Sequence, residues 1–298
     1  MYEAPCYFTF RKFVCLLTVL AGGIAVSCDF GWKETPAGGP VRFAVFDVGE
    51  GLAQAVVADG RSVLFDMGPP EEYMRWKTQF ELLGRPSVEA VVLSHDHLDH
   101  RGGLEFFDSV FQWTGLVVVT PYTDTALIRR SSPPWAARIH FRTVSAGDTL
   151  ALLHDVCLRC LWPPDSSGDS LYATDSLKNR YSTVFTVIHG RAKALITSDI
   201  DTVAERELVL QLDTGLAAEL CVVPHHGSAG SLSPVFYGYI RPHHAVVSCG
   251  AANTYGHPSQ SVLLWLSQMG ISVTITSLCG GFIGESDTYH WTFSNISE

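Results

Sequence analysis

The chain places four potential metal ligands in the pattern H-x-H-x-D-H within one short stretch, His95-Asp96-His97-Leu98-Asp99-His100. An apolar run, Val88–Leu93, precedes this stretch and is typical of a buried strand, and α/β sheets collect ligands where such strands end. Two imidazoles two residues apart on a tight loop can converge on one cation, while Asp99 and His100 turn toward a second cation. The pattern predicts a centre for two metal ions.

The alternative interpretation is an exposed, histidine-rich loop that binds nothing, which the position directly after a strand disfavours. Gly102 and Gly103 follow at once and predict a tight turn before a short helix over 104–107. We therefore expect the ligand loop to lie between two rigid elements.

The N-terminus has the pattern of an export signal. Arg11 and Lys12 precede an uncharged run, Phe13–Val26, that is short for a membrane span and typical of a signal peptide. Small residues before Cys28 resemble a bacterial lipobox, so residues 1–27 are expected to be a lipoprotein signal peptide, with Cys28 lipidated and attached to the membrane. Plain secretion and an uncleaved anchor are the alternatives.

The rest of the chain divides into a Gly- and Pro-rich tether, residues 28–40, and one domain, residues 41–298. With 47% apolar and 17% charged residues the chain is expected to be globular. Loss of residues 1–27 would reduce the 20 basic and 30 acidic residues to 18 and 29, a formal charge of −11. This charge argues against a broad, non-specific DNA-binding surface, although metal ions could create a local positive groove.

The five cysteines beyond position 28 lie mostly in apolar, strand-like sequence, and we expect buried, unpaired thiols rather than the alternative of one disulfide. They are Cys157, Cys160, Cys221, Cys249 and Cys279.

Strand patterns come first in hairpins and then alternate with helical patterns, in each half of the chain. This order predicts two mixed sheets packed face to face with helices outside, and the polar stretch 163–178 is expected to be a long surface loop.

Three polar loops each follow an apolar strand pattern: 95–100, Ser198-Asp199 and His225-His226. The carboxylate of Asp199 could bridge two cations, and a histidine of the third loop could complete the second site. Water shared by two divalent cations is hydroxide near neutral pH, in position to attack phosphorus or a carbonyl carbon. The constellation predicts metal-assisted hydrolysis.

These residues resemble the metallo-β-lactamase superfamily and, within it, the soluble domain of ComEC-type DNA-uptake proteins. The resemblance covers about residues 41–285 and implies a four-layer αββα sandwich of the α/β (α+β) class, with the active site at the shared edge of its two sheets. It rests on motifs in the family's order: Phe46–Gly51, Leu64–Gly68, His95–Gly103, Asn179–Ser182, Thr197–Asp199, Val223–Ser228 and Asn253–Pro258.

The resemblance also implies roles for individual residues. His95 and His97 would bind one metal ion, Asp99 and His100 the other, and Asp199 both. Either His225 or His226 would be the last ligand; provisionally, His225 is assigned to the metal and His226 to catalysis. The remaining implied roles are catalysis for Asp99 and His257, orientation of the ligand loop for Asp66, and substrate binding for Asp47, Asn179 and Ser182, for which turn chemistry is the alternative.

Two departures from the family pattern stand out. Many superfamily hydrolases have another ligand histidine before the bridging aspartate, and the candidates for it here are His140 and His154. At the two positions beside Gly51 where this branch has Gln and Asp, the chain has Glu50 and Leu52. This difference bears on the identity of the substrate rather than on metal binding.

The resulting expectation is an exported hydrolase with two divalent metal ions, Zn or Mn, acting on a phosphodiester. DNA and a cell-envelope phosphodiester are both candidate substrates, and the sequence points to no protein partner. A β-lactam or lactone hydrolase, or a binding lipoprotein that has lost catalysis, are the alternatives.

Overall fold

Two mixed β-sheets form the centre of the protein in a computed structural model that describes residues 39–107, 111–132, 137–165 and 174–296. The expected signal peptide, Cys28 and most of the tether lie outside the described residues. In the described ranges, no helix is long and apolar enough to span a bilayer.

The first sheet has eight strands in the order β15-β14-β1-β2-β3-β4-β5-β6. Hairpins join β1 to β2 and β2 to β3, whereas β3 to β6 run parallel. The ends of parallel strands meet at one edge of a sheet, so β3 and β4 deliver their following residues to the same place. The strands are Val41–Val45 (β1), Ala53–Ala58 (β2), Arg61–Met67 (β3), Ser87–Val92 (β4), Leu116–Val119 (β5), His140–Thr143 (β6), Phe282–Ser286 (β14) and Trp291–Asn295 (β15).

The second sheet has seven strands in the order β13-β12-β11-β10-β9-β8-β7. Its antiparallel half, β7 to β10, is followed by β11, β12 and β13, which run parallel to β10. These strands are Thr149–Leu153 (β7), Val156–Trp162 (β8), Val184–His189 (β9), Ala192–Ile196 (β10), Leu220–Val222 (β11), His244–Val247 (β12) and Ser272–Ile275 (β13).

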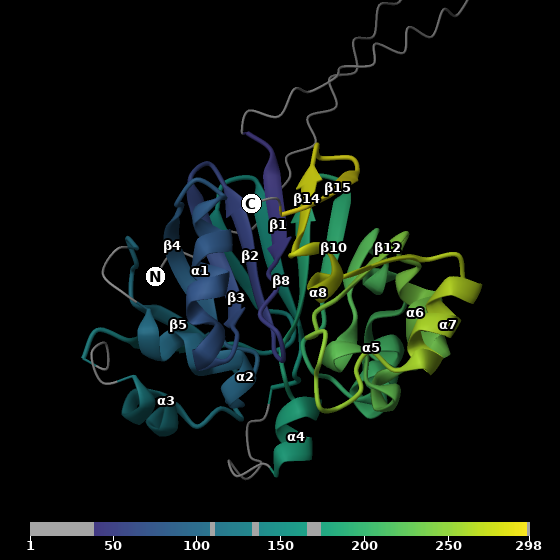
Figure 1. The fold of residues 1–298 in the computed structure, drawn as a ribbon, viewed down its shortest axis with the longest axis horizontal. Coiled ribbons are helices and arrows are strands. Elements are labelled where there is room, and N and C mark those ends of the chain that lie inside the picture. Colours follow the sequence, from purple (N-terminus) through teal and green to yellow (C-terminus); the bar gives the residue numbers. More distant parts are fainter. Residues whose placement is uncertain (1–38, 108–110, 133–136, 166–173, 297–298) are drawn as a thin grey trace, which may run out of the picture. The chain divides into compact units, whose positions relative to one another are not determined.

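Helices cover the outer face of each sheet (Figure 1). Aromatic residues of α1, among them Trp76 and Phe80, pack on the first sheet, and α5, α6 and α7 pack on the second. The α-helices are Tyr73–Glu81 (α1), Leu98–Arg101 (α2), Thr125–Ser131 (α3), Asp175–Arg180 (α4), Thr202–Leu212 (α5), Pro234–Ile240 (α6), Gln260–Gln268 (α7) and Thr276–Cys279 (α8). The 3-10 helices are Pro70–Glu72 (η1), Gly102–Phe106 (η2), Asp213–Leu216 (η3), Pro224–Gly227 (η4) and Ala229–Ser231 (η5).

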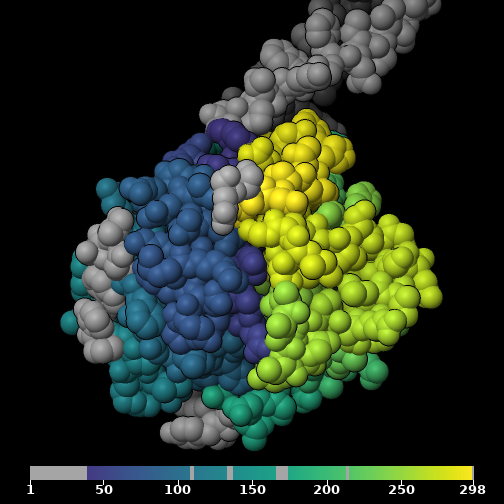
Figure 2. Space-filling model, viewed as in Figure 1, coloured from purple at the N-terminus to yellow at the C-terminus, as the bar shows by residue number. Residues whose placement is uncertain are grey.

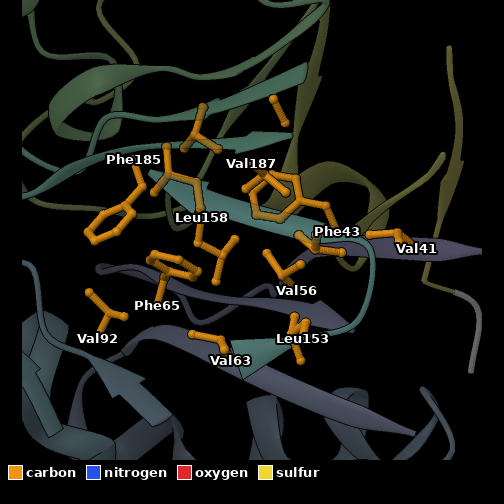
Figure 3. Packing of buried hydrophobic residues seen from close by; sticks show 14 of the residues in the cluster. Val41, Phe43, Val56, Val63, Phe65, Val92, Leu153, Leu158, Phe185 and Val187 are labelled. Carbon is orange, nitrogen blue, oxygen red and sulfur yellow. The ribbon is translucent and has the colours of Figure 1, made fainter. Parts of the chain in front are cut away.

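The largest apolar core fills the space between the two sheets (Figure 3). Phe65 of β3 and Phe185 of β9 meet edge to face, with ring centroids 5.3 Å apart. In the central strands alternate residues point into this layer, such as Val63 and Phe65 of β3 and Phe185 and Val187 of β9, as the period of a pleated strand requires. In Figure 2 the earlier residues (purple to teal) and the later residues (green to yellow) meet along a seam.

The predicted αββα sandwich is confirmed, and the five cysteines are free thiols. Two local predictions are wrong. The helix after the ligand loop begins at Leu98 rather than Leu104, and Gly102 has an ordinary helical φ of −58°. The stretch expected to be a loop as far as Lys178 ends in helix α4, since Thr174 accepts backbone bonds from Leu177 and Lys178.

Gly102 and Gly103 are needed for close approach rather than for a turn. A Cβ on Gly102 would lie 2.3 Å from Pro70, and a Cβ on Gly103 would lie 2.2 Å from the carbonyl oxygen of Met67. The two glycines therefore let the segment that follows the ligand loop pack directly on the end of β3.

Candidate metal centre

Asp66, on β3, organises the ligand loop that follows the neighbouring strand β4. Its carboxylate accepts hydrogen bonds from the backbone N–H of Ser94 at 2.8 Å, the hydroxyl of Ser94 at 2.7 Å and Nδ1 of His100 at 2.8 Å. A proton held on Nδ1 leaves Nε2 of His100 as the free ligand atom. The backbone of Asp66 is left-handed, with φ of 57°, a strained conformation typical of functional sites.

The other ligand-type side chains of this loop differ in burial. His95 is buried, with Nδ1 2.9 Å from the Ser94 hydroxyl and its ring centroid 4.2 Å from that of His100. Asp99, in the first turn of α2, has a side chain that is 42% exposed. The ring centroid of His97 lies 4.4 Å from that of His95, and Nε2 of His97 lies 3.5 Å from Asp175 of α4.

The second sheet contributes Asp199, which follows β10. Its backbone N–H donates to the hydroxyl of Ser182 at 3.1 Å, and the preceding residue, Ser198, is left-handed with φ of 48°. The carboxylate of Asp199 is buried and lies 3.3 Å from Nε2 of His100 and 3.5 Å from Nε2 of His226. It thus stands between the histidines of both sheets.

The adjacent residues His225 and His226 are held differently. Both are left-handed, but Nδ1 of His226 lies 2.9 Å from the carbonyl oxygen of Ser248, which directs Nε2 toward Asp99 and Asp199. Nε2 of His225 instead lies 3.4 Å from the side-chain amide of Asn179 and 3.9 Å from Asp199.

Two overlapping groups have metal-site geometry, His95 with His100 and Asp199, and Asp99 with His100 and His226. Within each group the ligand atoms lie within 4.8 Å of one another. His97 and His225 are in neither group.

Several buried atoms at this centre lack a hydrogen-bond partner, a costly arrangement away from water. They are Nε2 of His95, His97, His100 and His226, and Oδ1 of Asp199. Nitrogen and carboxylate donors that converge without partners fit a borderline cation such as Zn or Mn, which would satisfy them together. The residues present therefore fit a metal site of His/Asp type, in which the two groups share His100.

The electrostatics of the centre are consistent with this fit. Burial acts to raise the pKa of Asp199, but His100 and His226 hold that pKa well below its usual range. Burial acts to lower the pKa of His100, but Asp199, Asp66 and Asp99 raise it well above its ordinary value. Burial lowers the pKa of His95. The carboxylates of the centre thus stabilise positive charge at this position.

A cleft of about 400 Å³ opens over the centre. Asn179 and His257 line it, and the Tyr255 ring lies parallel to His257 with centroids 5.9 Å apart. The full lining is Glu50, Pro69, Glu71, His97, Leu98, Asp99, Asn179, Asp199, His225, His226, Tyr255 and His257.

Asp47 and Ser182, expected to bind substrate, do not line this cleft. The backbone of Asp47 exchanges hydrogen bonds with the Gln79 side chain, and its carboxylate lies 3.7 Å from Arg75. Ser182 is fully buried behind Asp199. In the structure the Asp47 backbone is bonded to Gln79, and the Ser182 hydroxyl holds the backbone of Asp199 in place.

The loop that contains Glu50 and Gly51 packs directly against the backbone of the ligand loop at Asp99. Gly51 has φ of +141°, and a Cβ there would lie 2.4 Å from the carbonyl oxygen of Asp99. That carbonyl accepts from the backbone N–H of Leu52, while Ser248 donates its hydroxyl to the carbonyl of Gly51. Leu52 itself is 2% exposed and belongs to the core between the sheets.

Ser94 and Ser248 fix the ligand histidines, yet no motif marked them beforehand. Ser94 could have been found from its position directly before the ligand loop. Ser248 follows β12 and acts through its backbone carbonyl oxygen, which any residue type has, so its sequence gives no signal of this role. His140 and His154 are both exposed, and neither belongs to the metal-type groups.

The fold and centre define a metallo-β-lactamase-fold protein with a His/Asp cluster of metal-site type. Residues 46–126 match the model of the metallo-beta-lactamase superfamily. Solved structures agree in fold: the metallo-beta-lactamase fold protein YhfI from Bacillus subtilis (TM-score 0.52, 12% identity, covering 83% of this chain and 100% of that one) and zinc-bound PqqB from Methylobacterium extorquens (TM-score 0.51, 11% identity, 78% and 97%).

The chain is also distantly homologous to competence proteins. It is 29% identical over 241 residues to competence protein ComA of Neisseria gonorrhoeae, covering 79% of this chain and 31% of that protein. It is 28% identical over 203 residues to ComE operon protein 3 of Bacillus subtilis, covering 66% of this chain and 24% of that protein. The chain thus spans only a quarter to a third of these relatives' lengths.

Proposed function

We propose that this protein is a metal-dependent hydrolase of phosphodiesters. The observation that carries the proposal is the convergence of unpartnered, buried ligand atoms from both sheets at the floor of an open cleft. A cleft over such a centre can admit one ester group to the ligand atoms while its substituents stay in the outer cleft.

In this proposal His95 and Asp199 hold one ion, with His97 beside them, and Asp99, His100 and His226 hold the other, with Asp199 within reach of both ions. We favour His226 over His225 as the last ligand because the Ser248 carbonyl fixes its tautomer and aims Nε2 at the cluster. Bound ions of this kind lower the pKa of water and polarise a phosphoryl oxygen. Asn179, His225 and His257 would contact the substrate from the cleft wall.

The competence-protein relatives support a phosphodiester over a lactam or lactone. Export and membrane attachment through Cys28 remain part of the proposal. A binding protein that has lost catalysis is the rival, and the absence of both bound metal and turnover would favour it.

The test is hydrolysis of bis-p-nitrophenyl phosphate by the purified protein loaded with Mn or Zn. We expect metal-dependent turnover that falls more than about 100-fold in Asp99→Asn, because that change removes a charged ligand. Glu207→Gln, an equal loss of charge at an exposed position of α5, should turn over normally. Bound metal without turnover of any phosphodiester would overturn the proposal.

A further inference from the structure

The wall of the cleft carries negative charge that the metal ligands do not explain. Glu50 and Glu71 line the cleft, and within the described residues neither forms an ion pair with a basic side chain. One oxygen of Glu50 accepts a hydrogen bond from the backbone N–H of Thr254, so its other oxygen is available to a ligand. Glu71 is exposed at the start of η1.

No lysine or arginine lines the same cleft. The nearest basic groups on the elements around it already have acidic partners. Lys178 lies 2.8 Å from Asp96, Arg180 lies 2.9 Å from Asp201, Arg101 lies 3.1 Å from Glu105, and Arg75 lies 3.2 Å from Glu72.

This distribution is unfavourable for a polyanion. Nucleic-acid binding depends on several phosphates each meeting Lys or Arg, whereas the lining of this cleft contains Glu50 and Glu71 and no basic side chain other than histidine. One phosphodiester can bind over the centre, where buried His226 and Asp199 direct unpartnered atoms toward the cleft.

Glu50 and Tyr255 also border a small hollow that adjoins the centre. Its lining includes Asp99, His226 and His257, which it shares with the main cleft. The Tyr255 side chain is 74% exposed, so its ring is open to a ligand. A carboxylate beside an accessible aromatic ring is a favourable environment for an alkylammonium group.

We propose that the cleft selects a phosphodiester in which one substituent carries an alkylammonium group, held by Glu50, Glu71 and Tyr255. This inference rests on the proposed hydrolase function and specifies its substrate class. In the reaction, water's oxygen forms a bond to phosphorus as the bond to the leaving oxygen breaks. The products are a phosphomonoester that keeps the ammonium group, an alcohol or phenol, and a proton released to solvent.

The experiment compares two esters with the same leaving group, p-nitrophenyl phosphorylcholine and thymidine 5′-p-nitrophenyl phosphate, on the metal-loaded protein. We expect a higher kcat/KM for the choline ester. Glu50→Gln and Glu71→Gln should each lower the choline-to-thymidine ratio of kcat/KM by about three- to fivefold, the upper range for an exposed ion pair. Glu50→Gln keeps the acceptor for Thr254, so only the charge is lost.

Glu72→Gln is the matched control. Glu72 is adjacent to Glu71 but is paired with Arg75 and lines the neighbouring pocket, not this cleft. An unchanged ratio in Glu72→Gln, beside lowered ratios in the other two variants, would support the proposal.

Equal ratios in all variants, or a higher kcat/KM for the thymidine ester or a single-stranded oligonucleotide, would overturn it while leaving phosphodiester hydrolysis intact. If neither ester is hydrolysed, the proposed function itself fails.

Discussion

At the scale of single residues, the centre depends on which ring nitrogen each histidine presents. Asp66 fixes His100 and the Ser248 carbonyl fixes His226, in each case through Nδ1. The unpartnered Nε2 atoms of these two histidines, which follow strands of different sheets, then lie within 4.8 Å of each other. Partners of this kind normally orient a ligand and increase its basicity.

The adjacent histidines provide a direct test of this idea. We expect His226→Ala to retain one metal ion per chain and His225→Ala to retain two, because only His226 belongs to a metal-type group. The measurement is elemental analysis after dialysis against low concentrations of Mn or Zn. The reverse result, one ion lost in His225→Ala alone, would assign the ligand role to His225.

The ligand loop could be predicted from sequence because four ligand-type residues follow one apolar strand. The choice between His225 and His226 could not, since both are left-handed neighbours with the same chemistry. Only the position of a backbone carbonyl from another strand, at Ser248, separates them.

At the scale of elements, most strands and helices could be predicted from the alternation of apolar residues and from turn residues such as Asp59-Gly60. Helix α4 could not be predicted, because its sequence is polar and it is held by ion pairs with residues outside the helix. Lys178 pairs with Asp96, and Arg180 pairs with Asp201. Figure 1 shows α2 and α4 at the same edge of the fold. A polar helix held by ion pairs has no apolar period to reveal it.

The loop containing Gly51 is expected to control the ligand loop through backbone contact. Gly51→Ala would place a Cβ 2.4 Å from the Asp99 carbonyl and 2.8 Å from Pro69, so we expect a loss of about 2 kcal/mol or more in the free energy of unfolding and weaker metal binding. Urea unfolding and a metal titration measure the two effects.

Gly60→Ala is the control for backbone conformation alone. Gly60 also has a positive φ, 74°, but no atom lies within 4 Å of an added Cβ. It should cost about 1 kcal/mol and leave metal affinity unchanged. Equal metal affinity in the Gly51 and Gly60 variants would refute the contact.

At the scale of the whole molecule, the centre joins the two sheets. His95, Asp99 and His100 follow β4 of the first sheet, and Asp199 and His226 follow β10 and β11 of the second. A cation bound by both groups would stabilise the folded state, since an unfolded chain cannot bring these residues together.

Removal of metal should therefore lower the stability of the entire fold. At free metal near 100 times Kd each site adds about 2.7 kcal/mol, which corresponds to a rise in Tm of roughly 5–10 °C. Calorimetry of metal-loaded and EDTA-treated protein measures this shift, and Asp199→Asn should reduce it. Identical melting temperatures at full metal occupancy would show that the ions do not link the sheets.

The position of β1 has a consequence for biosynthesis. β1 lies between β2 and β14, so its second neighbour comes from near the other end of the described chain, and all of β7 to β13 is made in between. A ribosome releases residues in order, so β1 cannot pair with its second neighbour until residues 282–286 have been made. The export leader that we propose at residues 1–27 would therefore emerge well before the first sheet could be completed.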